Sequence, residues 1–230
     1  MLKLEGIEVR QGAFALQADM ELAQGRNYAV IGPSGAGKST LLGALCGFIP
    51  LARGRLTWNG AELTHVDPGA RPMTMLFQDN NLFPHLSVLQ NVGLGLRPDL
   101  KLTPAETAQV ETALDRVGLA DQMTKKPGAL SGGQQSRAAL ARVLVQARPW
   151  VLLDEPFAAL GPALRVEMLA LVKQLVTETG AGLIMVTHAP EDVRRIADEV
   201  IFVASGRAEA PQPAAALLDN PPPALKAYLG

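Results

Sequence analysis

The hydrophobic positions of the chain fall into short continuous runs, separated by polar turns and amphipathic stretches. The runs cover residues 28–31, 73–77, 150–153, 183–186 and 200–203. Continuous apolar runs of this length are typical of parallel strands that are covered on both faces. Segments 39–48 and 163–179 lie between such runs and are predicted to be helical. This alternation predicts an α/β domain with a mostly parallel sheet.

The two ends of the chain follow a different pattern. Residues 2–9, 14–22 and 55–58 are punctuated by the turn pairs Gln11-Gly12 and Asn59-Gly60, which predicts an antiparallel β portion. The tail, residues 210–230, is rich in proline and alanine. We expect it to form a short helix and a loop on the surface.

Residues 84–146 contain no strong strand run. Thr103, Pro104 and Glu106 mark a helix start with proline at the first position and an acid in the first turn. Apolar residues then recur at helical spacing, at Val110, Ala113, Leu114 and Val117. We therefore expect a single domain over residues 1–230. In it, a helical subdomain at 84–146 is inserted into an α/β core made of residues 1–83 and 147–230.

The composition indicates a folded protein without nucleic-acid partners. Of its 230 residues 48% are hydrophobic and 19% charged, and the formal net charge is -1, which fits neither disorder nor a basic binding surface. Cys46 is the only cysteine, so no internal disulfide can form. We expect no signal peptide and no membrane span. A function at a membrane would therefore need another chain to hold this one there.

A glycine-rich segment, GPSGAGKST, follows the first apolar run and precedes a predicted helix. Its spacing, Gly32-x4-Gly37-Lys38-Ser39, is that of a phosphate-binding loop. Glycines allow successive backbone N–H groups to point into one anion site, and the helix adds its positive end. Lys38 would reach the β- and γ-phosphates, and the Ser39 hydroxyl would bind Mg²⁺. The alternative is a glycine-rich strand-to-helix turn with a surface lysine.

An acidic pair, Asp154 and Glu155, ends the apolar run 150–153. Ligands of open α/β sheets bind at this end of the strands. Asp154 would hold Mg²⁺ through water, and Glu155 would orient and polarise an attacking water. The alternative is an acidic helix N-cap before Pro156. The glycine loop elsewhere in the chain favours the first interpretation.

A second glycine-rich helix start occurs at Leu130-Ser131-Gly132-Gly133-Gln134. The segment that follows is rich in alanine and leucine and is predicted to be helical to about residue 146. This helix start would be a second phosphate-facing N-terminus in one chain. A single nucleotide does not need two such sites built far apart, whereas two chains facing head to tail would use each site once.

These motifs make the chain resemble the ATP-hydrolysing subunits of ABC transporters over about residues 1–208. GPSGAGKST, Gln78 in MLFQD, LSGGQ, VLLDE and His188 in MVTH occur in the family's order, with LSGGQ about two dozen residues before VLLDE. The resemblance implies a P-loop NTPase core with an N-terminal antiparallel β portion and an inserted helical subdomain that carries the signature motif. It also implies ATP and Mg²⁺ as ligands and hydrolysis of ATP.

Three segments resemble the ATP-binding subunits of bacterial thiamine importers more narrowly. They are MLFQDNNLFPHLSVLQNVGLGL, LSGGQQSRAALARVL and LLDEPFAALGPALR. Subunits of importers for ferric iron, sulfate or polyamines are similar through the ATP site, so another small solute is the alternative. The resemblance implies transmembrane permease partners and, indirectly, a periplasmic or extracellular solute-binding protein. It places the chain peripherally on the cytoplasmic face of the bacterial inner membrane.

The resemblance also implies roles for individual residues. His188 would contact the γ-phosphate and help Glu155 hold the water, and Gln78 would bind Mg²⁺ and that water and sense the membrane partner. The alternatives are a helix cap for His188 and a strand-end polar residue for Gln78. The implied Mg²⁺ ligands are Ser39, Gln78 and Asp154. The implied ATP-binding residues are Gly32, Pro33, Ser34, Gly35, Ala36, Gly37, Lys38, Ser39, Thr40 and Phe14, and, from the opposite subunit, Ser131, Gly132, Gly133 and Gln134.

Two positions depart from the family's pattern. Gly161 stands where the family usually has an aspartate that links the two ATP sites of the dimer, so communication between the sites is expected to differ. Gln11 stands where the family often places an aromatic residue that stacks on adenine. Phe14 is the nearest aromatic residue, and it would either stack on adenine or pack in the core.

Residues 79–85 follow Gln78 at the junction with the predicted helical subdomain. In the family, such a segment borders a groove that receives a short helix of the transmembrane subunit. Leu82 and Phe83 are the candidate anchors for that helix. The alternative is that both are core residues of the subdomain.

Other functions explain the sequence less completely. A mechanical ABC ATPase that acts on DNA or ribosomes usually carries a long coiled coil or two cassettes in one chain, and this sequence has neither. A small-molecule kinase would use the glycine loop but would leave LSGGQ and His188 unexplained. A fourth alternative is a regulatory protein that binds nucleotide without hydrolysing it. Measurable ATP hydrolysis that is abolished by Glu155→Gln would exclude this alternative.

Overall fold

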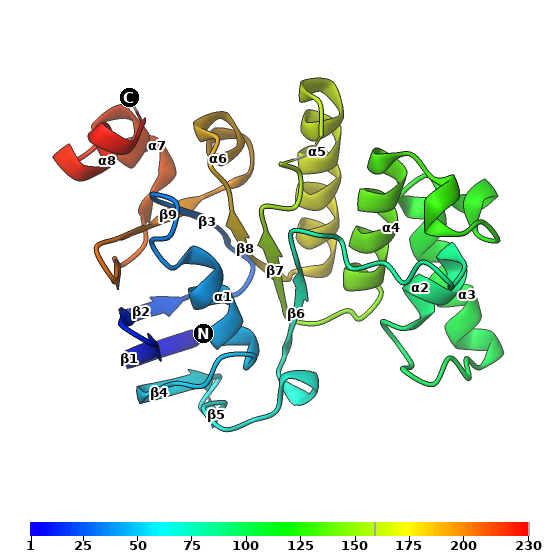
Figure 1. Ribbon diagram of the computed structural model, residues 1–230, viewed down its shortest axis with the longest axis horizontal. Coiled ribbons are helices and arrows are strands. Elements are labelled where there is room, and N and C mark those ends of the chain that lie inside the picture. Colours follow the sequence, from blue (N-terminus) through cyan, green and yellow to red (C-terminus); the bar gives the residue numbers. More distant parts are fainter. Residues whose placement is uncertain (159, 230) are drawn as a thin grey trace.

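The computed structural model describes residues 1–158 and 160–229, and one mixed sheet organises them (Figure 1). The strand order along the sheet is β5-β4-β1-β2-β10-β9-β3-β8-β7-β6. The antiparallel part contains β1 (Leu2–Gln11), β2 (Phe14–Leu22), β4 (Arg53–Trp58) and β5 (Ala61–Glu62). The parallel part contains β3 (Asn27–Ile31), β6 (Met73–Leu76), β7 (Trp150–Asp154), β8 (Gly182–Val186) and β9 (Glu199–Ala204).

Two short strands complete the sheet. β10 (Arg207–Ala208) pairs parallel with β2 and antiparallel with β9, so it joins the two parts of the sheet. β11 (Gln212–Pro213) pairs with β9 outside the main strand order. The predicted α/β class, with a mostly parallel core and an antiparallel N-terminal portion, is confirmed.

The parallel strands are the five apolar runs of the sequence, and helices cover both of their faces. Every residue of β3, β7 and β8 is buried. On β7, Leu152 packs in one core cluster with α1 (Lys38–Cys46), whereas Val151 and Leu153 pack in a second cluster with α5 (Pro162–Thr179). This coverage explains why the runs are continuous rather than alternating.

The residues between 84 and 146 form helices and turns with a core cluster of their own. The elements are α2 (Val88–Gly93), α3 (Pro104–Arg116), α4 (Gly132–Leu144) and the 3₁₀ turns η2 (Ala120–Gln122) and η3 (Pro127–Ala129); a further 3₁₀ turn, η1 (Pro68–Ala70), precedes β6. Val110 and Leu114 are fully buried in this cluster, while Leu140 of α4 packs on the α5 side of the sheet. α4 therefore belongs to both cores.

The C-terminal tail was expected to be a short helix and a loop on the surface, and that expectation was wrong. The tail contains two helices, α7 (Ala214–Asp219) and α8 (Pro223–Leu229). Leu217, Leu218 and Leu225 are 5%, 8% and 0% exposed, in a cluster with Phe202 of β9 and Val193 of α6 (Pro190–Ile196). The apolar face of these helices is buried because, together with α6, it covers one face of the sheet over β3 and β9.

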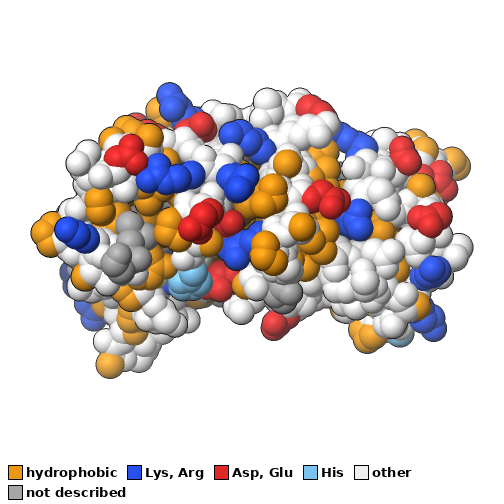
Figure 2. Space-filling model, turned by 90° about the horizontal axis from the view of Figure 1, so that it is seen from above, with side chains coloured by type: hydrophobic (Ala, Val, Ile, Leu, Met, Phe, Trp, Pro, Cys, Tyr) orange, Lys and Arg blue, Asp and Glu red, His pale blue; other side chains and the backbone are white. Residues whose placement is uncertain are grey.

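Two features of the described residues bear on a membrane or nucleic-acid partner: their helices and the distribution of charge on one face. Within the described part of the chain, no helix combines the length and the apolar character needed to cross a bilayer. On the face shown in Figure 2, acidic side chains lie beside the basic ones, with apolar side chains between them. This mixture agrees with the net charge of -1.

Candidate functional site

The glycine loop connects the end of β3 to the start of α1, and its backbone is compact. Gly37 is the N-cap of α1 with φ 105°, a conformation that side-chain-bearing residues rarely adopt, and no side chain caps this helix start. A Cβ on Gly37 would lie 2.6 Å from Cζ of Phe14. The first backbone N–H groups of α1 are therefore left without a capping side chain, as an anion site requires.

Lys38 folds back beneath this loop. Its Nζ donates to the carbonyl oxygens of Gly32 at 2.8 Å and Pro33 at 2.9 Å. Lys38 is only 6% exposed, and this burial lowers the pKa of its ammonium group, while nearby Glu155 and Asp154 act in the opposite direction. The lysine thus holds a positive charge inside the loop, close to two carboxylates.

Ser39 and Asp154 meet although they lie far apart in the sequence. The Ser39 hydroxyl donates to Oδ1 of Asp154 at 3.1 Å. Burial raises the pKa of the Asp154 carboxyl, and the hydrogen bond from Ser39 opposes this shift. A hydroxyl and a carboxylate are the oxygen ligands that Mg²⁺ prefers. Among the described residues, no group of three or more His, Cys, Asp or Glu side chains is placed to hold a metal ion.

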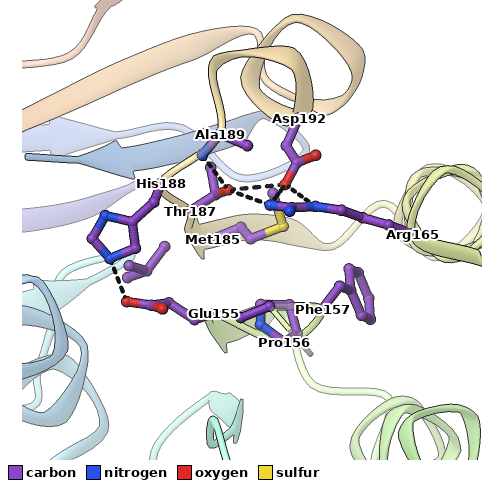
Figure 3. A pocket seen from close by; sticks show the side chains of 11 residues that line it. Glu155, Pro156, Phe157, Arg165, Met185, Thr187, His188, Ala189 and Asp192 are labelled. Carbon is purple, nitrogen blue, oxygen red and sulfur yellow. Dashed lines mark hydrogen bonds and ion pairs between the residues drawn. The ribbon is translucent and has the colours of Figure 1, made fainter. Parts of the chain in front are cut away.

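Glu155 and His188 face each other at the carboxyl ends of β7 and β8 (Figure 3). His188 Nε2 lies 2.7 Å from Oε1 of Glu155. Glu155 has a positive φ of 47°, and its N–H donates to the carbonyl oxygen of Val186 at 3.2 Å. A strained backbone held by a strand contact fixes the direction of the Glu155 carboxylate. The pair can therefore orient a water and accept its proton.

A polar cluster behind this pair escaped the sequence analysis. Arg165 Nε donates to Oδ2 of Asp192 at 2.8 Å, and the Thr187 hydroxyl donates to the same oxygen at 2.9 Å. Asp192 is 5% exposed. Figure 3 shows how the cluster joins the start of α5, the end of β8 and the start of α6. It anchors the segment that carries His188, and no motif in the sequence pairs these residues.

A cavity of about 560 Å³ collects the predicted site residues of the α/β core. It is lined by Gln11, Phe14, Ser34, Gly35, Gly37, Lys38, Ser39, Thr40, Gln78, Glu155 and His188. Gly32, Pro33 and Asp154 support it through the contacts with Lys38 and Ser39 described above. The structure therefore brings the glycine loop, the acidic pair, Gln78 and His188 to one place.

The second glycine-rich helix start lies outside this cavity. Ser131 and Gly132 are exposed, whereas Gly133 is buried against Leu164 of α5. In Figure 1, β6 and β7 lie between α1 and α4. None of the residues Ser131 to Gln134 lines the cavity beside α1. Within one chain, the two predicted phosphate-binding helix starts do not meet.

Leu82 and Phe83, the two candidate anchors, differ in how far they are buried. Leu82 packs against two core clusters, as the core alternative predicts. Phe83 is 47% exposed, as a surface anchor would be.

Phe14 packs beside Leu16 and Gly37 and also lines the nucleotide cavity. Its contact with adenine stays a prediction.

Gly161 is the N-cap of α5 and has φ -65°. Nothing lies within 4 Å of a Cβ built on it. Neither the backbone conformation nor the available space requires glycine at this position. An aspartate would fit here without displacing a neighbour.

Sequence reasoning missed one further residue at the site. Tyr228 of α8 places its hydroxyl 3.0 Å from Nδ1 of His188. No sequence signal pointed to it, because the contact depends on how the tail folds back over the sheet.

Comparisons with known proteins agree with this geometry. The sequence profile of the ABC transporter family matches residues 16–158. The chain is 59% identical over 230 residues to the thiamine import ATP-binding protein ThiQ of Cereibacter sphaeroides, and also to that of Ruegeria sp. (strain TM1040), with 100% of both chains covered in each case. It is 46% identical over 230 residues to ThiQ of Brucella suis biovar 1, covering 100% of this chain and 95% of that protein.

Two solved structures of dimeric ATP-binding cassettes have the same fold. Each matches with a TM-score of 0.81 and 26% sequence identity. In both cases the match covers 93% of this chain and 99% of the chain in the solved structure. One is a bacterial ABC transporter cassette. The other is a post-hydrolysis state bound to ADP and phosphate.

Proposed function

The chain belongs to the ABC transporter family as an ATP-hydrolysing subunit, and from this premise we propose that two copies bind ATP between them and drive the uptake of thiamine or a thiamine phosphate. One observation carries the dimer: the helix start at Ser131 lies outside the cavity that collects the rest of the site. A second copy in reverse orientation supplies that helix start to the γ-phosphate. The second glycine-rich helix start also argues against a small-molecule kinase, because a kinase of this kind needs only one phosphate-binding helix start.

In the proposed reaction the chain's own residues position ATP and one water. The backbone N–H groups of the glycine loop and the Lys38 ammonium bind the phosphates. Glu155 holds the water and accepts its proton as the water oxygen bonds to the γ-phosphorus and the bond to the ADP oxygen breaks. His188 donates to the γ-phosphate, and Gln78 contacts the same water. Phosphate and ADP are then released when the dimer opens.

Mg²⁺ fits this site, with Ser39, Asp154 and Gln78 as the residues that would hold it. The Ser39 hydroxyl and the Asp154 carboxylate already lie 3.1 Å apart, and Gln78 lines the same cavity. When bound, the cation neutralises charge on the β- and γ-phosphate oxygens.

The proposed membrane contact lies beside Gln78. Phe83 is 47% exposed and Phe48 is 53% exposed. Phe48 also packs against Phe77, the residue before Gln78, with ring centroids 5.4 Å apart. Exposed aromatic residues, one of which packs against the neighbour of Gln78, suit a short apolar helix of a permease subunit. Such a contact would hold the chain at the cytoplasmic face of the inner membrane.

Reconstitution tests the proposal. The chain is assembled with its permease subunits in vesicles, and ATPase activity is measured with a thiamine-binding protein and thiamine or thiamine phosphate. We expect these ligands to stimulate hydrolysis, whereas ferric iron, sulfate or polyamines with their own binding proteins do not. Stimulation by one of the other solutes instead would reject thiamine and leave the ATPase assignment intact.

A further inference from the structure

Both ring nitrogens of His188 have partners, and one of them comes from an unexpected element. Nε2 lies 2.7 Å from Oε1 of Glu155. Nδ1 lies 3.0 Å from the hydroxyl oxygen of Tyr228, which is 40 residues further along the chain. The two rings are tilted by 50°, with their centroids 6.5 Å apart. The tail thus reaches the side of His188 that faces away from Glu155.

The position of Tyr228 is fixed by packing. Leu225, one helical turn before it, is 0% exposed in the cluster with Phe202. Tyr228 packs against the edge of the same cluster. Arg194 of α6 donates to Asp219 of α7 at 2.8 Å, which joins the tail to the segment that follows His188. The hydroxyl is therefore held in place by a helix that the buried side chain of Leu225 anchors to this cluster.

The chemistry of the three groups determines where the protons lie. An ionised carboxylate only accepts hydrogen bonds, so the nitrogen facing Glu155 carries the hydrogen. In a neutral imidazole Nδ1 is then an acceptor, and the Tyr228 hydroxyl is its donor. Burial raises the pKa of the Tyr228 phenol, so it keeps its proton near neutral pH. The arrangement is satisfied by a single tautomer of His188.

We propose that Tyr228 is a positioning residue for ATP hydrolysis: its hydroxyl fixes the Nε2–H tautomer of His188 and holds this N–H toward Glu155 and the γ-phosphate. The proposal rests on the role proposed above for His188. The other tautomer would turn a lone pair toward a carboxylate and a phosphate, both of which are anionic. Tyr228 thus adds a second hydrogen bond that favours the tautomer already favoured by Glu155, without touching the reacting groups itself.

Tyr228→Phe tests this directly because it keeps the ring and removes only the hydroxyl. The chain has three histidines, so ¹⁵N-histidine labelling gives a readable spectrum of the imidazole nitrogens. At about pH 8.5 we expect His188 of the wild type to be one tautomer and that of Tyr228→Phe to be a mixture. One neutral hydrogen bond corresponds to roughly a three- to tenfold change in the tautomer ratio.

Tyr28→Phe is the matched control, since the chain has two tyrosines. The Tyr28 hydroxyl accepts from the N–H of Ala23 at 2.8 Å, away from the site. In the reconstituted importer we expect Tyr228→Phe to lower kcat three- to tenfold with KM for ATP unchanged, while Tyr28→Phe leaves both constants unchanged. An unchanged His188 spectrum, or a mixed spectrum with unchanged kcat, would each overturn the proposal. A His188→Gln variant with wild-type kcat would instead reject the proposed role of His188 itself.

Discussion

The starts of α1 and α4 are both glycine-rich, yet they are built differently. At α1 the N-cap is Gly37 in the left-handed conformation, and no side chain caps the helix. At α4 the N-cap is Ser131, whose hydroxyl oxygen accepts from the N–H of Gln134 at 3.3 Å while the Gln134 side chain accepts from the N–H of Ser131 at 2.9 Å. The first helix start leaves its N–H groups open to water or a ligand, whereas the second satisfies two of its own with side chains.

This difference shows what each helix start can do in a single chain. The loop at α1 lies in a cavity with Lys38 and Glu155, the proposed general base, so it can hold phosphates without help. The start of α4 is exposed and stable by itself, but the hydrogen of the Ser131 hydroxyl remains available to donate outward. α4 therefore suits a role as the second half of a site whose first half lies on another molecule.

Glu155→Gln should give the largest effect, and it acts only at the α1 site. Removing a general base costs about 10²–10⁴ in rate, so we expect kcat to fall in this range while ATP still binds. The isosteric change leaves the cavity intact. With ATP present but not hydrolysed, dimers of the variant should accumulate, and size-exclusion chromatography with light scattering would detect them. Glu111→Gln, an exposed glutamate on α3, is the control. Near-normal turnover in Glu155→Gln would remove the proposed base from the mechanism.

Ser131→Ala separates the stabilising role of the α4 cap from its proposed role in dimerisation. Losing an N-cap hydroxyl costs about 1 kcal/mol of unfolding free energy. Thr103→Ala should cost about as much, because α3 has the same capping box with Glu106. We expect only Ser131→Ala to weaken ATP-dependent dimerisation, by about five- to tenfold, as measured by ultracentrifugation. Equal dimerisation in both variants would leave Ser131 as a helix cap alone.

Phe14→Ala tests whether the Phe14 ring contacts the adenine of ATP bound at the α1 site. If the ring stacks on adenine, ATP affinity should fall about fivefold, which corresponds to about 1 kcal/mol for one aromatic contact. Leu16→Ala is the matched variant, because Leu16 also packs against Gly37 but does not line the cavity. Isothermal titration below the unfolding transition of both variants makes the comparison. A similar loss of affinity in both would assign Phe14 to packing.

Gly161→Asp should have the smallest effect on stability. Aspartate is a better N-cap than glycine by a few tenths of a kcal/mol, and the open space around Gly161 accommodates it. We expect a slightly higher free energy of unfolding, together with a changed ATPase rate or changed cooperativity in ATP. Identical steady-state kinetics would show that this position does not connect the two sites.

Much of this fold was predictable because its strands are buried on both faces. The run 150–153 became β7 with Leu152 on one face and Val151 and Leu153 on the other, and burial on both faces is what makes such runs continuous. Capping signals also located α3, which begins at Pro104 after the N-cap Thr103. β10 was not predictable, since two residues carry no periodicity and pair only because β2 and β9 already lie beside them.

The site divides in the same way. The glycine loop and the acidic pair were predicted from their spacing and His188 from the family resemblance, and each lies at the end of a buried strand. Asp192 and Tyr228 could not be assigned, because their contacts depend on how α6 and α8 pack. The tail in particular was expected on the surface, although Leu225 is completely buried. The proline-rich composition of the tail gave no signal for α8, because tertiary packing stabilises this helix and its own propensity does not.

The most direct test of the shared site is a cysteine cross-link between its two halves. Ser34 and Ser131 are both exposed and are replaced by cysteine in the Glu155→Gln chain. Cys46 stays inert because it is buried, which raises the pKa of its thiol to about 12. We predict that oxidation yields covalent dimers when ATP is present and almost none without it. A disulfide within one monomer, or dimers that form equally without ATP, would contradict the two-chain site.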